Sequence, residues 1–465
     1  MIENDAFKLL LINLFHLNPD DIANILCTTF NKMMVLLVTL TDKHQACPYC
    51  GFTAPKIKEY VTKEITHSAL TTQKCIIKYR ARRYKCSCCG KTYYEFNPFV
   101  FKSQKISILT VHNILKDLKD FNETFTSVAR RYHVSPTSVS TIFDNHVDIG
   151  RNPLPEIINF DEVYAFKSEK SKYVCVLLDF KKQIPVDVLP NRKKEYLLNY
   201  FQKIPLEERK KVKYACSDMY EVYRDVVHKV FPSCCMILDY FHLAADFHKK
   251  INQVRIDVMK GYKDNKASDE YYLLKKFNWL LFKNPEDEDK YGRLFDVERE
   301  RKYNSHFKSY MNYYDLRKKL LEINNDLTIC YSLKLELVDF YSKSTVDNAK
   351  ENLENLIRSC IDTNIDEMIA FSNNLINWKQ EIINSFTIVG TEYKVEADKG
   401  QVVVCNKKVN NAIIENRNKI IKCIKNNANG YTNWSRFRNR VMYVLDPNAT
   451  FSLEPREKQS WMHKT

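Results

Sequence analysis

The chain has 465 residues, of which 45% are hydrophobic, and 72 Lys and Arg residues outnumber 57 Asp and Glu residues to give a net charge of +15. This length suggests about two to four domains. The excess of basic residues favours a polyanionic partner, most commonly nucleic acid, over the alternative that the charge serves solubility alone.

Cysteine usage and the shortness of the apolar segments indicate an intracellular protein. The 15 cysteines are an odd number, and several lie in apolar stretches such as "YVCVLLDF" and "LTICYSL". This pattern is typical of reduced thiols, some of them used to bind metal. The start "MIENDAFK" lacks the basic segment of a secretory signal, and the longest apolar run, "MMVLLVTL", is far too short to span a membrane. We therefore expect no membrane partner.

The first expected unit, residues 1–98, has a partly helical start, a strand at "MMVLLVTL" and a zinc ribbon. The ligands would be the cysteines of two C-x-x-C pairs, each followed by Gly: Cys47, Cys50, Cys86 and Cys89. Two intervening residues let one tight turn direct both sulfurs at one Zn²⁺ ion, and the Gly permits the positive φ of that turn. One or two hairpins must fill the long gap between the pairs. The alternative is a chance cluster of thiols.

A strongly basic segment surrounds the second cysteine pair. Residues 74–91 hold seven basic residues and no acidic residue. Lys and Arg side chains neutralise DNA phosphates and so position a protein on the duplex. We expect the ribbon to contact the DNA backbone through Arg80, Arg82, Arg83 and Lys85.

Residues 99–150 predict a helix-turn-helix. "NETFTSVARRYHV" has an apolar helical face, and "SPTSVSTIF" then restarts a helix. Ser135 is a good N-cap for this second helix, and Pro136 is favoured at its first position. The outward side chains of the second helix would read DNA: Thr137, Ser138 and Thr141. The alternative is an ordinary helical hairpin.

Residues 151–245 alternate strands and helices. The expected strands are 156–166, 172–180, 184–190, 212–218 and 234–242, and the expected helices are 193–204 and 219–231. Three strands followed by strand–helix–strand units describe a ribonuclease-H-like α/β fold, in which the first and fourth strands lie side by side. This segment would be the first part of a catalytic core.

Two acids in this core have a mechanistic interpretation. Asp161 lies in the first expected strand, and Asp218 ends the fourth. Adjacent parallel strands would bring both carboxylates within bridging distance of divalent ions, which offset their repulsion. Two Mg²⁺ or Mn²⁺ ions about 3.5–4 Å apart can activate a water or a 3′-hydroxyl and stabilise the leaving oxygen in phosphodiester chemistry. The alternative is that both acids are merely exposed at strand ends.

The remaining chain divides into two expected units. Residues 246–405 are charged and almost free of Gly and Pro, which predicts an all-α insertion with Trp279 and Trp378 in its core. Residues 406–465 would complete the catalytic core and end in a C-terminal tail. The first part of that segment, 406–440, holds nine basic residues and one acid. The expected fold class is an α+β multidomain protein.

The combination of motifs resembles the ISL-three family of insertion-sequence transposases. The resemblance covers nearly the whole chain and rests on "CPYCG", "RRYKCSCCGKTYYE", "INFDEV", "KYVCVLLDFKKQIPVDVLPNR", "LDYFHLAADFHKKINQVR" and "NAIIENRNKIIKCIKNNANGYTNWSRFRNRV". It implies a DDE transposase in which Asp161 and Asp218 are the first two catalytic acids. The third would be Glu415, on a helix that follows the insertion.

The helix of Glu415 also fits this role chemically. Residues at i+3, i+4 and i+7 share its face: Asn418, Lys419 and Lys422. A lone carboxylate on a basic face suits a metal ligand beside DNA phosphates, and both lysines would bind DNA. The alternative is a solvated basic helix with one compensating Glu. The family usually has glycines flanking this glutamate, where the present sequence has Ala412 and Asn416.

Two further residues near the acids have expected roles. Asp239 and His242 form a D-x-x-H pattern that resembles a recurrent feature of this family and related transposases. His242 would orient the scissile phosphate or transfer a proton, and the alternative is a structural histidine at a strand end. Because successive strand residues face opposite sides, Glu162 would point away from Asp161 towards a basic side chain.

The leading functional hypothesis is therefore an enzyme. It would bind the terminal inverted repeats of its element on double-stranded DNA, cut the ends and join the 3′-hydroxyls to target DNA. Mg²⁺ or Mn²⁺ would be catalytic, Zn²⁺ structural, and pairing of two ends would require at least a dimer. The expected location is the bacterial cytoplasm, at the nucleoid. The alternatives are an inactive zinc-ribbon and helix-turn-helix regulator, or a ribonuclease-H-like nuclease without strand transfer.

Overall fold

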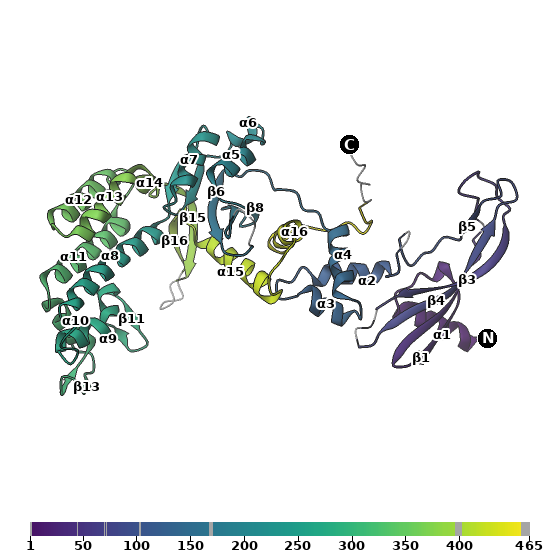
Figure 1. Ribbon diagram of the computed structural model, residues 1–465, viewed down its shortest axis with the longest axis horizontal. Coiled ribbons are helices and arrows are strands. Elements are labelled where there is room, and N and C mark those ends of the chain that lie inside the picture. Colours follow the sequence, from purple (N-terminus) through teal and green to yellow (C-terminus); the bar gives the residue numbers. More distant parts are fainter. Residues whose placement is uncertain are drawn as a thin grey trace.

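The molecule is elongated, with a β-rich N-terminal part at one end and a helical part at the other (Figure 1). A computed structural model describes residues 2–43, 45–68, 70, 72–101, 104–166, 171–395 and 402–456. A mixed sheet with its covering helices lies between the two ends, and three short helices connect it to the N-terminal part. The predicted tail beyond residue 456 lies outside the described residues.

The N-terminal part is a five-stranded sheet with one helix packed against it. Its strand order is β1-β2-β4-β3, and β5 pairs with β4. The elements are α1 (Ile2–Leu14), η1 (Pro19–Asp21), β1 (Ile22–Phe30), β2 (Met33–Leu40), β3 (Lys56–Thr66), β4 (Cys75–Lys85) and β5 (Thr92–Tyr94). The antiparallel β3–β4 hairpin fills the gap between the two cysteine pairs, and the predicted helical start and the strand at "MMVLLVTL" are both present.

Three short helices follow the N-terminal sheet: α2 (Ile108–Asp117), α3 (Phe125–Arg131) and α4 (Pro136–His146). The side chain of Ser135 accepts a hydrogen bond from the Ser138 amide at the N-cap of α4, as the sequence predicts. The turn between α3 and α4 includes His133 with a φ of 54°. Val128, Val139 and Phe143 are fully buried between the helices, so α3 and α4 form one packed pair.

The central sheet has five strands in the order β10-β9-β6-β7-β8. These strands are β6 (Ile157–Val163), β7 (Val174–Asp179), β8 (Pro185–Leu189), β9 (Tyr214–Ser217) and β10 (Cys235–Leu238). β6, β7 and β8 are antiparallel, whereas β9 pairs in parallel with β6 and with β10. The first and fourth strands are therefore adjacent, as predicted, with Asn159 opposite Cys216.

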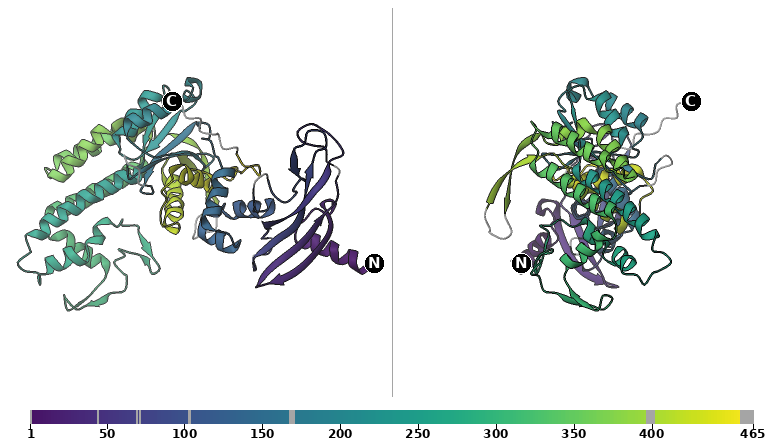
Figure 2. Two further views of the ribbon diagram at one scale, coloured as in Figure 1. Left: turned by 45° about the vertical axis from the view of Figure 1, so that its right-hand side comes forward. Right: turned by 90° about the vertical axis from the view of Figure 1, so that its left-hand side faces the viewer.

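Helices cover both faces of this sheet, as Figure 2 shows. On one face lie α5 (Lys194–Gln202), α6 (Leu206–Arg209) and α7 (Glu221–Val230), and on the other lie α15 (Ala412–Asn427) and α16 (Trp434–Leu445). Alternate residues of β7 enter the two cores: Leu177 packs with the first group and Val176 with the second. Because burial of such a side chain contributes about 1.5–3 kcal/mol, this period-two pattern fixes the register of the strand.

One predicted strand is too long, and the difference matters for the site. The expected strand 234–242 ends at Leu238, and helix α8 (Tyr240–Lys260) begins two residues later. The sequence after Leu238 has helical periodicity, with Leu243, Phe247 and Ile251 buried along one side of α8. Asp239 and His242 therefore lie at a strand-to-helix junction and not within a strand.

We call residues 240–384 the helical arm. After α8 it contains α9 (Asp269–Lys276), η2 (Asn278–Phe282), α10 (Tyr313–Glu322), α11 (Asn325–Lys343), α12 (Ala349–Asp362), α13 (Asp366–Asn377) and α14 (Lys379–Asn384). Trp378 is buried in its core and Trp279 packs against that core, as predicted. Within the described ranges, no helix is both long enough and apolar enough to cross a membrane.

The prediction that residues 246–405 are all-α is wrong. This region also contains β11 (Glu288–Asp289), β12 (Gly292–Arg293), β13 (Lys302–Asn304), β14 (Ser309–Met311), β15 (Ile388–Val395) and β16 (Val402–Lys408), paired as hairpins. β15 and β16 are rich in Val, Ile, Thr and Tyr, the residue types that favour strands. The expected boundary between residues 405 and 406 falls inside β16.

Candidate active site

The four predicted zinc-ligating cysteines lie together at the end of the β3–β4 hairpin. The Sγ atoms of Cys47 and Cys89 are 3.7 Å apart, those of Cys50 and Cys86 are 3.5 Å apart, and all four lie within 4.8 Å of one another. A tetrahedral site with Zn–S bonds of about 2.3 Å places its sulfurs about 3.8 Å apart. The four thiols are therefore arranged as a metal ion of this kind requires.

Matching turns hold the two cysteine pairs. The Gly51 amide donates to the Cys47 carbonyl at 2.8 Å, and the Gly90 amide donates to the Cys86 carbonyl at 3.0 Å. Both glycines have the positive φ that the sequence predicts, 74° and 72°. The Cys89 amide also donates to the Cys86 sulfur, which lowers the pKa of Cys86 to about 7 and favours the thiolate that binds metal.

The basic residues of β4 differ in their availability for DNA. Arg80 and Lys85 are exposed, and Arg83 is half-buried and paired with Glu59 at 2.7 Å. Arg82 is already engaged within the sheet, because its Nη1 lies 2.8 Å from an oxygen of buried Glu95 and its Nη2 donates to the Leu40 carbonyl at 3.1 Å. Glu95 follows β5, and the pairing of β5 with β4 places the carboxylate beside Arg82.

The predicted DNA-reading residues of α4 lie along its outer side. Thr137 and Thr141 are exposed. Ser138 is half-buried, and its hydroxyl lies 2.8 Å from the Ser135 hydroxyl in the N-cap. Thr137 and Thr141 are thus free to face a ligand, whereas Ser138 mainly supports the cap.

Asp161 occupies the face of β6 that is covered by α15. Its carboxylate accepts hydrogen bonds from the Glu162 amide and from the Asn418 side-chain amide, both at 2.7 Å. The side chain is buried, and burial raises the pKa of Asp161 to about 7, with the nearby charge of Asp218 acting in the same direction. The charged form of such a buried carboxyl is unfavourable unless a cation lies close to it.

Asp218 and Asp239 follow the ends of two adjacent parallel strands, β9 and β10. The Asp239 amide donates to the Ser217 carbonyl at 3.0 Å, so the two acids leave the sheet side by side. Burial raises the pKa of Asp218 to about 6 and also raises the pKa of Asp239. One oxygen of each carboxylate is buried without a hydrogen-bond partner in the described part of the chain.

His242 links Asp239 to Glu415. Its Nε2 atom lies 3.8 Å from Glu415 Oε1 and 4.0 Å from Asp239 Oδ2, and donor atoms of these three residues all lie within 4.8 Å of one another. The charge of His242 also opposes the rise in the pKa of Asp161 and of Asp218. Among the described residues, the predicted trio of Asp161, Asp218 and Glu415 is not itself a group within 4.8 Å.

Buried asparagines attach the Glu415 helix to the sheet. The side-chain amide of Asn159 donates to the Asn410 carbonyl at 2.8 Å and to the Asn411 side chain at 2.7 Å. The Asn411 backbone amide donates to Asp239 at 3.0 Å. No sequence motif predicted these contacts, although a polar Asn159 within the apolar run "IINF" is a signal for a buried hydrogen-bond partner.

The remaining predicted residues lie around this junction. Glu162 forms an ion pair with Arg192 and accepts a hydrogen bond from Tyr223 at 3.3 Å, on the opposite face of β6 from Asp161, as predicted. On α15, the residues at the flanking glycine positions and the two predicted DNA-binding lysines are all exposed: Ala412, Asn416, Lys419 and Lys422. Asn418 is instead buried against Asp161.

This donor set fits a divalent cation with oxygen ligands. Asp239, His242 and Glu415 have donor atoms within 4.8 Å of one another, and His242 also interacts electrostatically with Asp161 and Asp218. Two buried carboxylate oxygens, of Asp218 and Asp239, lack a hydrogen-bond partner in the described residues. Carboxylate-rich sites suit Mg²⁺ or Mn²⁺, and a bound cation would stabilise the charged forms that burial disfavours. The residues able to hold it are Asp161, Asp218, Asp239, Glu415 and, for Mn²⁺, His242.

Comparison with known proteins identifies the family. Residues 158–397, more than half of the chain, match the family model of transposases of the ISL-three type. The chain belongs to the ISL-three family of transposases. It is also similar to the transposase for insertion sequence element IS1001 from Bordetella parapertussis, with 19% identity over 412 residues, which cover 88% of this chain and 91% of the relative.

Membership of this family has direct consequences for the site. The transposase is an enzyme that acts on DNA in transposition, and its DDE class implies the use of divalent metal. The family match includes Asp161 and Asp218 and ends before Glu415. The position of Glu415 in the site therefore depends on the contacts of α15 with β6, α8 and the Asp239 junction.

Proposed function

We propose that this transposase binds the terminal inverted repeats of its insertion sequence and catalyses metal-dependent cleavage and strand transfer of the DNA ends. The catalytic core would be ribonuclease-H-like, formed by residues 151–239 and 409–456, with the helical arm and the β15–β16 hairpin inserted between them. The strand order supports this proposal, because three antiparallel strands continue into two parallel strands that carry acids at their ends.

The observation that carries the proposal is that His242 lies 3.8 Å from Glu415 while its charge acts on the pKa of both Asp161 and Asp218. These three acids come from β6, the end of β9 and α15, which are far apart in the chain. Asp161, Asp218 and Asp239 are acids whose pKa burial raises, and clustered groups with shifted pKa values are typical of functional sites. A purely structural role would leave two buried carboxylate oxygens without partners, each at a cost of about 1–3 kcal/mol.

The residues would divide the chemistry among them. Asp161, Asp218 and Glu415 would hold the divalent ions, which supply charge stabilisation to the attacked phosphodiester and activate the attacking oxygen. Asn418 orients the Asp161 carboxylate through its 2.7 Å hydrogen bond. His242, 3.8 Å from Glu415, would donate a proton or a hydrogen bond to a phosphate oxygen. Glu162 is held by Arg192 on the other face and would not bind the ions, although its charge contributes to the raised pKa of Asp218 and of Asp161.

The N-terminal units would supply DNA binding. Zn²⁺ on the four clustered cysteines would stabilise the ribbon, so that Arg80 and Lys85 can contact phosphates. Thr137 and Thr141 on α4 would face the major groove as in a helix-turn-helix. Pairing of two element ends would require two copies of the chain.

The proposal is tested with a duplex that carries the inverted repeat found in the DNA flanking the gene. Wild-type protein should nick and join this duplex only in the presence of Mg²⁺ or Mn²⁺, and Asp161→Ala should bind it but leave it uncut. Joined products on a gel separate strand transfer from simple nuclease activity. If the two proteins bind equally and cut equally poorly, the enzyme proposal fails and an inactive DNA-binding regulator remains.

A further inference from the structure

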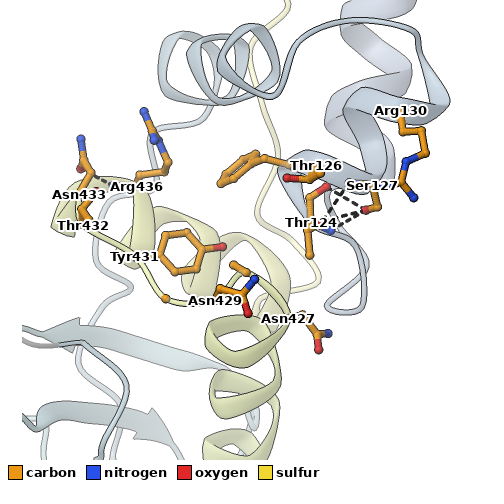
Figure 3. A pocket seen from close by; sticks show the side chains of 13 residues that line it. Thr124, Thr126, Ser127, Arg130, Asn427, Asn429, Tyr431, Thr432, Asn433 and Arg436 are labelled. Carbon is orange, nitrogen blue, oxygen red and sulfur yellow. Dashed lines mark hydrogen bonds between the residues drawn. The ribbon is translucent and has the colours of Figure 1, made fainter.

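A polar pocket of about 410 Å³ lies between the predicted helix-turn-helix and the loop that follows the Glu415 helix. Figure 3 shows Thr126 and Arg130 of α3 on one side of the pocket and Asn427 and Asn429, at the end of α15, on the other. No function has been assigned so far to this pocket. It is formed by α3, which packs against the proposed DNA-reading helix α4, and by the loop between α15 and α16.

The chemistry of the pocket suits an anion. Two arginines line it, and none of its lining residues in the described chain is acidic. Arg436 is already paired with Asp144 at 2.6 Å, whereas the side chain of Arg130 is exposed and forms no ion pair or hydrogen bond with any described residue. Exposed hydroxyl and amide side chains surround Arg130 and likewise have no partner among the described residues: Thr126, Asn427, Asn429 and Thr432.

Buried hydrogen bonds connect the two sides of the pocket. Arg440 of α16 is almost fully buried and donates to the carbonyls of Asp120 and Glu123, just before α3. The Tyr443 hydroxyl donates to the Leu115 carbonyl at 3.0 Å. Since α16 packs with α15 on the central sheet, these contacts hold α3 at a fixed position relative to Glu415.

The outer side of α15 connects the pocket to the site. Glu415 lies in the first turn of this helix and Asn427 is its last residue. At about 1.5 Å per residue the two are about 18 Å apart, which corresponds to about five nucleotides at 3.4 Å each. Lys419 and Lys422 are exposed along this path, on the same side as Glu415.

We propose that this pocket binds a backbone phosphate of the element end, about five nucleotides from the scissile bond, with Arg130 as its cation. The proposal rests on the proposed function and adds a positioning role to it. In a helix-turn-helix the first helix crosses the DNA backbone, which is where α3 presents Arg130. A phosphate held at a fixed distance from Glu415 would set which bond reaches the carboxylates.

The test uses the full-length protein and terminal-repeat duplexes in which single phosphates, two to nine nucleotides from the cut, are replaced by neutral methylphosphonates. Cleavage rate and affinity are measured for wild type, Arg130→Gln and Arg358→Gln. Arg358 is an exposed arginine on α12 of the helical arm, the helix labelled in Figure 1, and serves as the control because it lies outside the pocket.

The wild type should show a clear loss of cleavage when one phosphate near the fifth nucleotide is neutral. Arg130→Gln should cut the unmodified duplex about as slowly as wild type cuts the duplex with that neutral phosphate. Its cleavage rate should not fall further when the same phosphate is neutral, since both changes remove the same contact. For Arg130→Gln, the slope of log affinity against log salt concentration should be smaller in magnitude than the wild-type slope by about one. The control should behave as wild type.

Two other outcomes distinguish a failure of the pocket proposal from a failure of the proposed function. If wild type cleaves but Arg130→Gln keeps the wild-type sensitivity at every phosphate, the pocket proposal is wrong and the proposed function stands. If wild type shows no metal-dependent cleavage of any duplex, the proposed function fails and the pocket proposal fails with it.

Discussion

The cysteine cluster and the carboxylate site are two candidate metal centres that differ in where their ligands come from: the first uses two local turns, and the second uses segments far apart in the chain. Each cysteine pair lies in one tight turn, and one hairpin brings the two turns together with sulfurs 3.5–3.7 Å apart. The carboxylate site combines acids from β6, the ends of β9 and β10, and α15. It buries like charges, and burial raises the pKa of Asp161 to about 7.

This difference is the one expected between a metal site that serves folding and one that serves chemistry. A closed set of four thiolates leaves no open position for a substrate, which is typical of structural zinc. The carboxylate site is maintained by the packing of α15 and by buried asparagines, and it retains carboxylate oxygens without partners in the described residues. Loss of metal should therefore unfold the first site and only inactivate the second.

The largest expected effect is at the carboxylate site. Asp161→Asn should lower cleavage on the order of 10³-fold, as when a main electrostatic stabiliser of the transition state is lost, and leave DNA affinity unchanged. Glu162→Gln is the matched control on the adjacent strand residue and should do less damage, because Glu162 faces Arg192. Rates of nicking and binding isotherms measure both effects. Equal loss of cleavage in the two variants would mean that the catalytic face of β6 is misplaced.

The next effect concerns folding of the ribbon. Cys86→Ser should remove bound zinc and unfold the region around the cysteine cluster, because structural zinc contributes about 10–16 kcal/mol of binding energy to such small units. The central sheet should keep its thermal transition. Zinc content by mass spectrometry and limited proteolysis measure this, with Cys88→Ser as the control because Cys88 is exposed and outside the cluster. Retention of zinc by Cys86→Ser would contradict the four-thiolate site.

A smaller effect is expected for the residue that orients Asp161. Asn418→Ala removes the 2.7 Å hydrogen bond to the carboxylate and should lower cleavage about 10–100-fold, the usual loss for a residue that supports a metal ligand. Asn416→Ala, on the exposed side of the same helix, should change little. Wild-type rates in both variants would show that Asp161 needs no such support.

The smallest effect is a pH-dependent change in stability. The pKa of Asp161 rises from 3.8 to about 7 on folding, so its favourable contribution is complete below about pH 3.8 and is lost as pH rises through about 7. Metal-free wild type should therefore melt progressively below Asp161→Asn between about pH 4 and pH 7. Mg²⁺ should narrow the difference at pH 8. A melting-temperature difference that is the same at every pH would contradict a buried, uncompensated carboxyl.

The comparison also explains what the sequence could predict. Some features depend only on local patterns of spacing and burial, and the structure has them where they were expected. They are the cysteine pairs, the Ser135 cap and the strands at 157–163 and 174–179. The parallel neighbourhood of the first and fourth strands followed from the order of elements.

Other features depend on contacts between distant segments. Arg82 turns inward because β5 brings Glu95 beside it, which no pattern within "YRARRYK" reveals. Asp239 joins the site because its strand ends at Leu238, four residues before the expected end. The hydrogen bonds of Asn159 and Asn418 join β6 to a helix that is more than two hundred residues away in the chain.

The most direct test of the central claim is the location of the catalytic metal. Crystals of the protein soaked in Mn²⁺ give an anomalous signal that places each ion. We predict Mn²⁺ coordinated by the carboxylates of Asp161 and Asp218, with Glu415 completing the site, and loss of this signal in Asp161→Asn. Mn²⁺ bound only at Asp239 and His242, or absent from this edge of the sheet at saturating concentration, would contradict it.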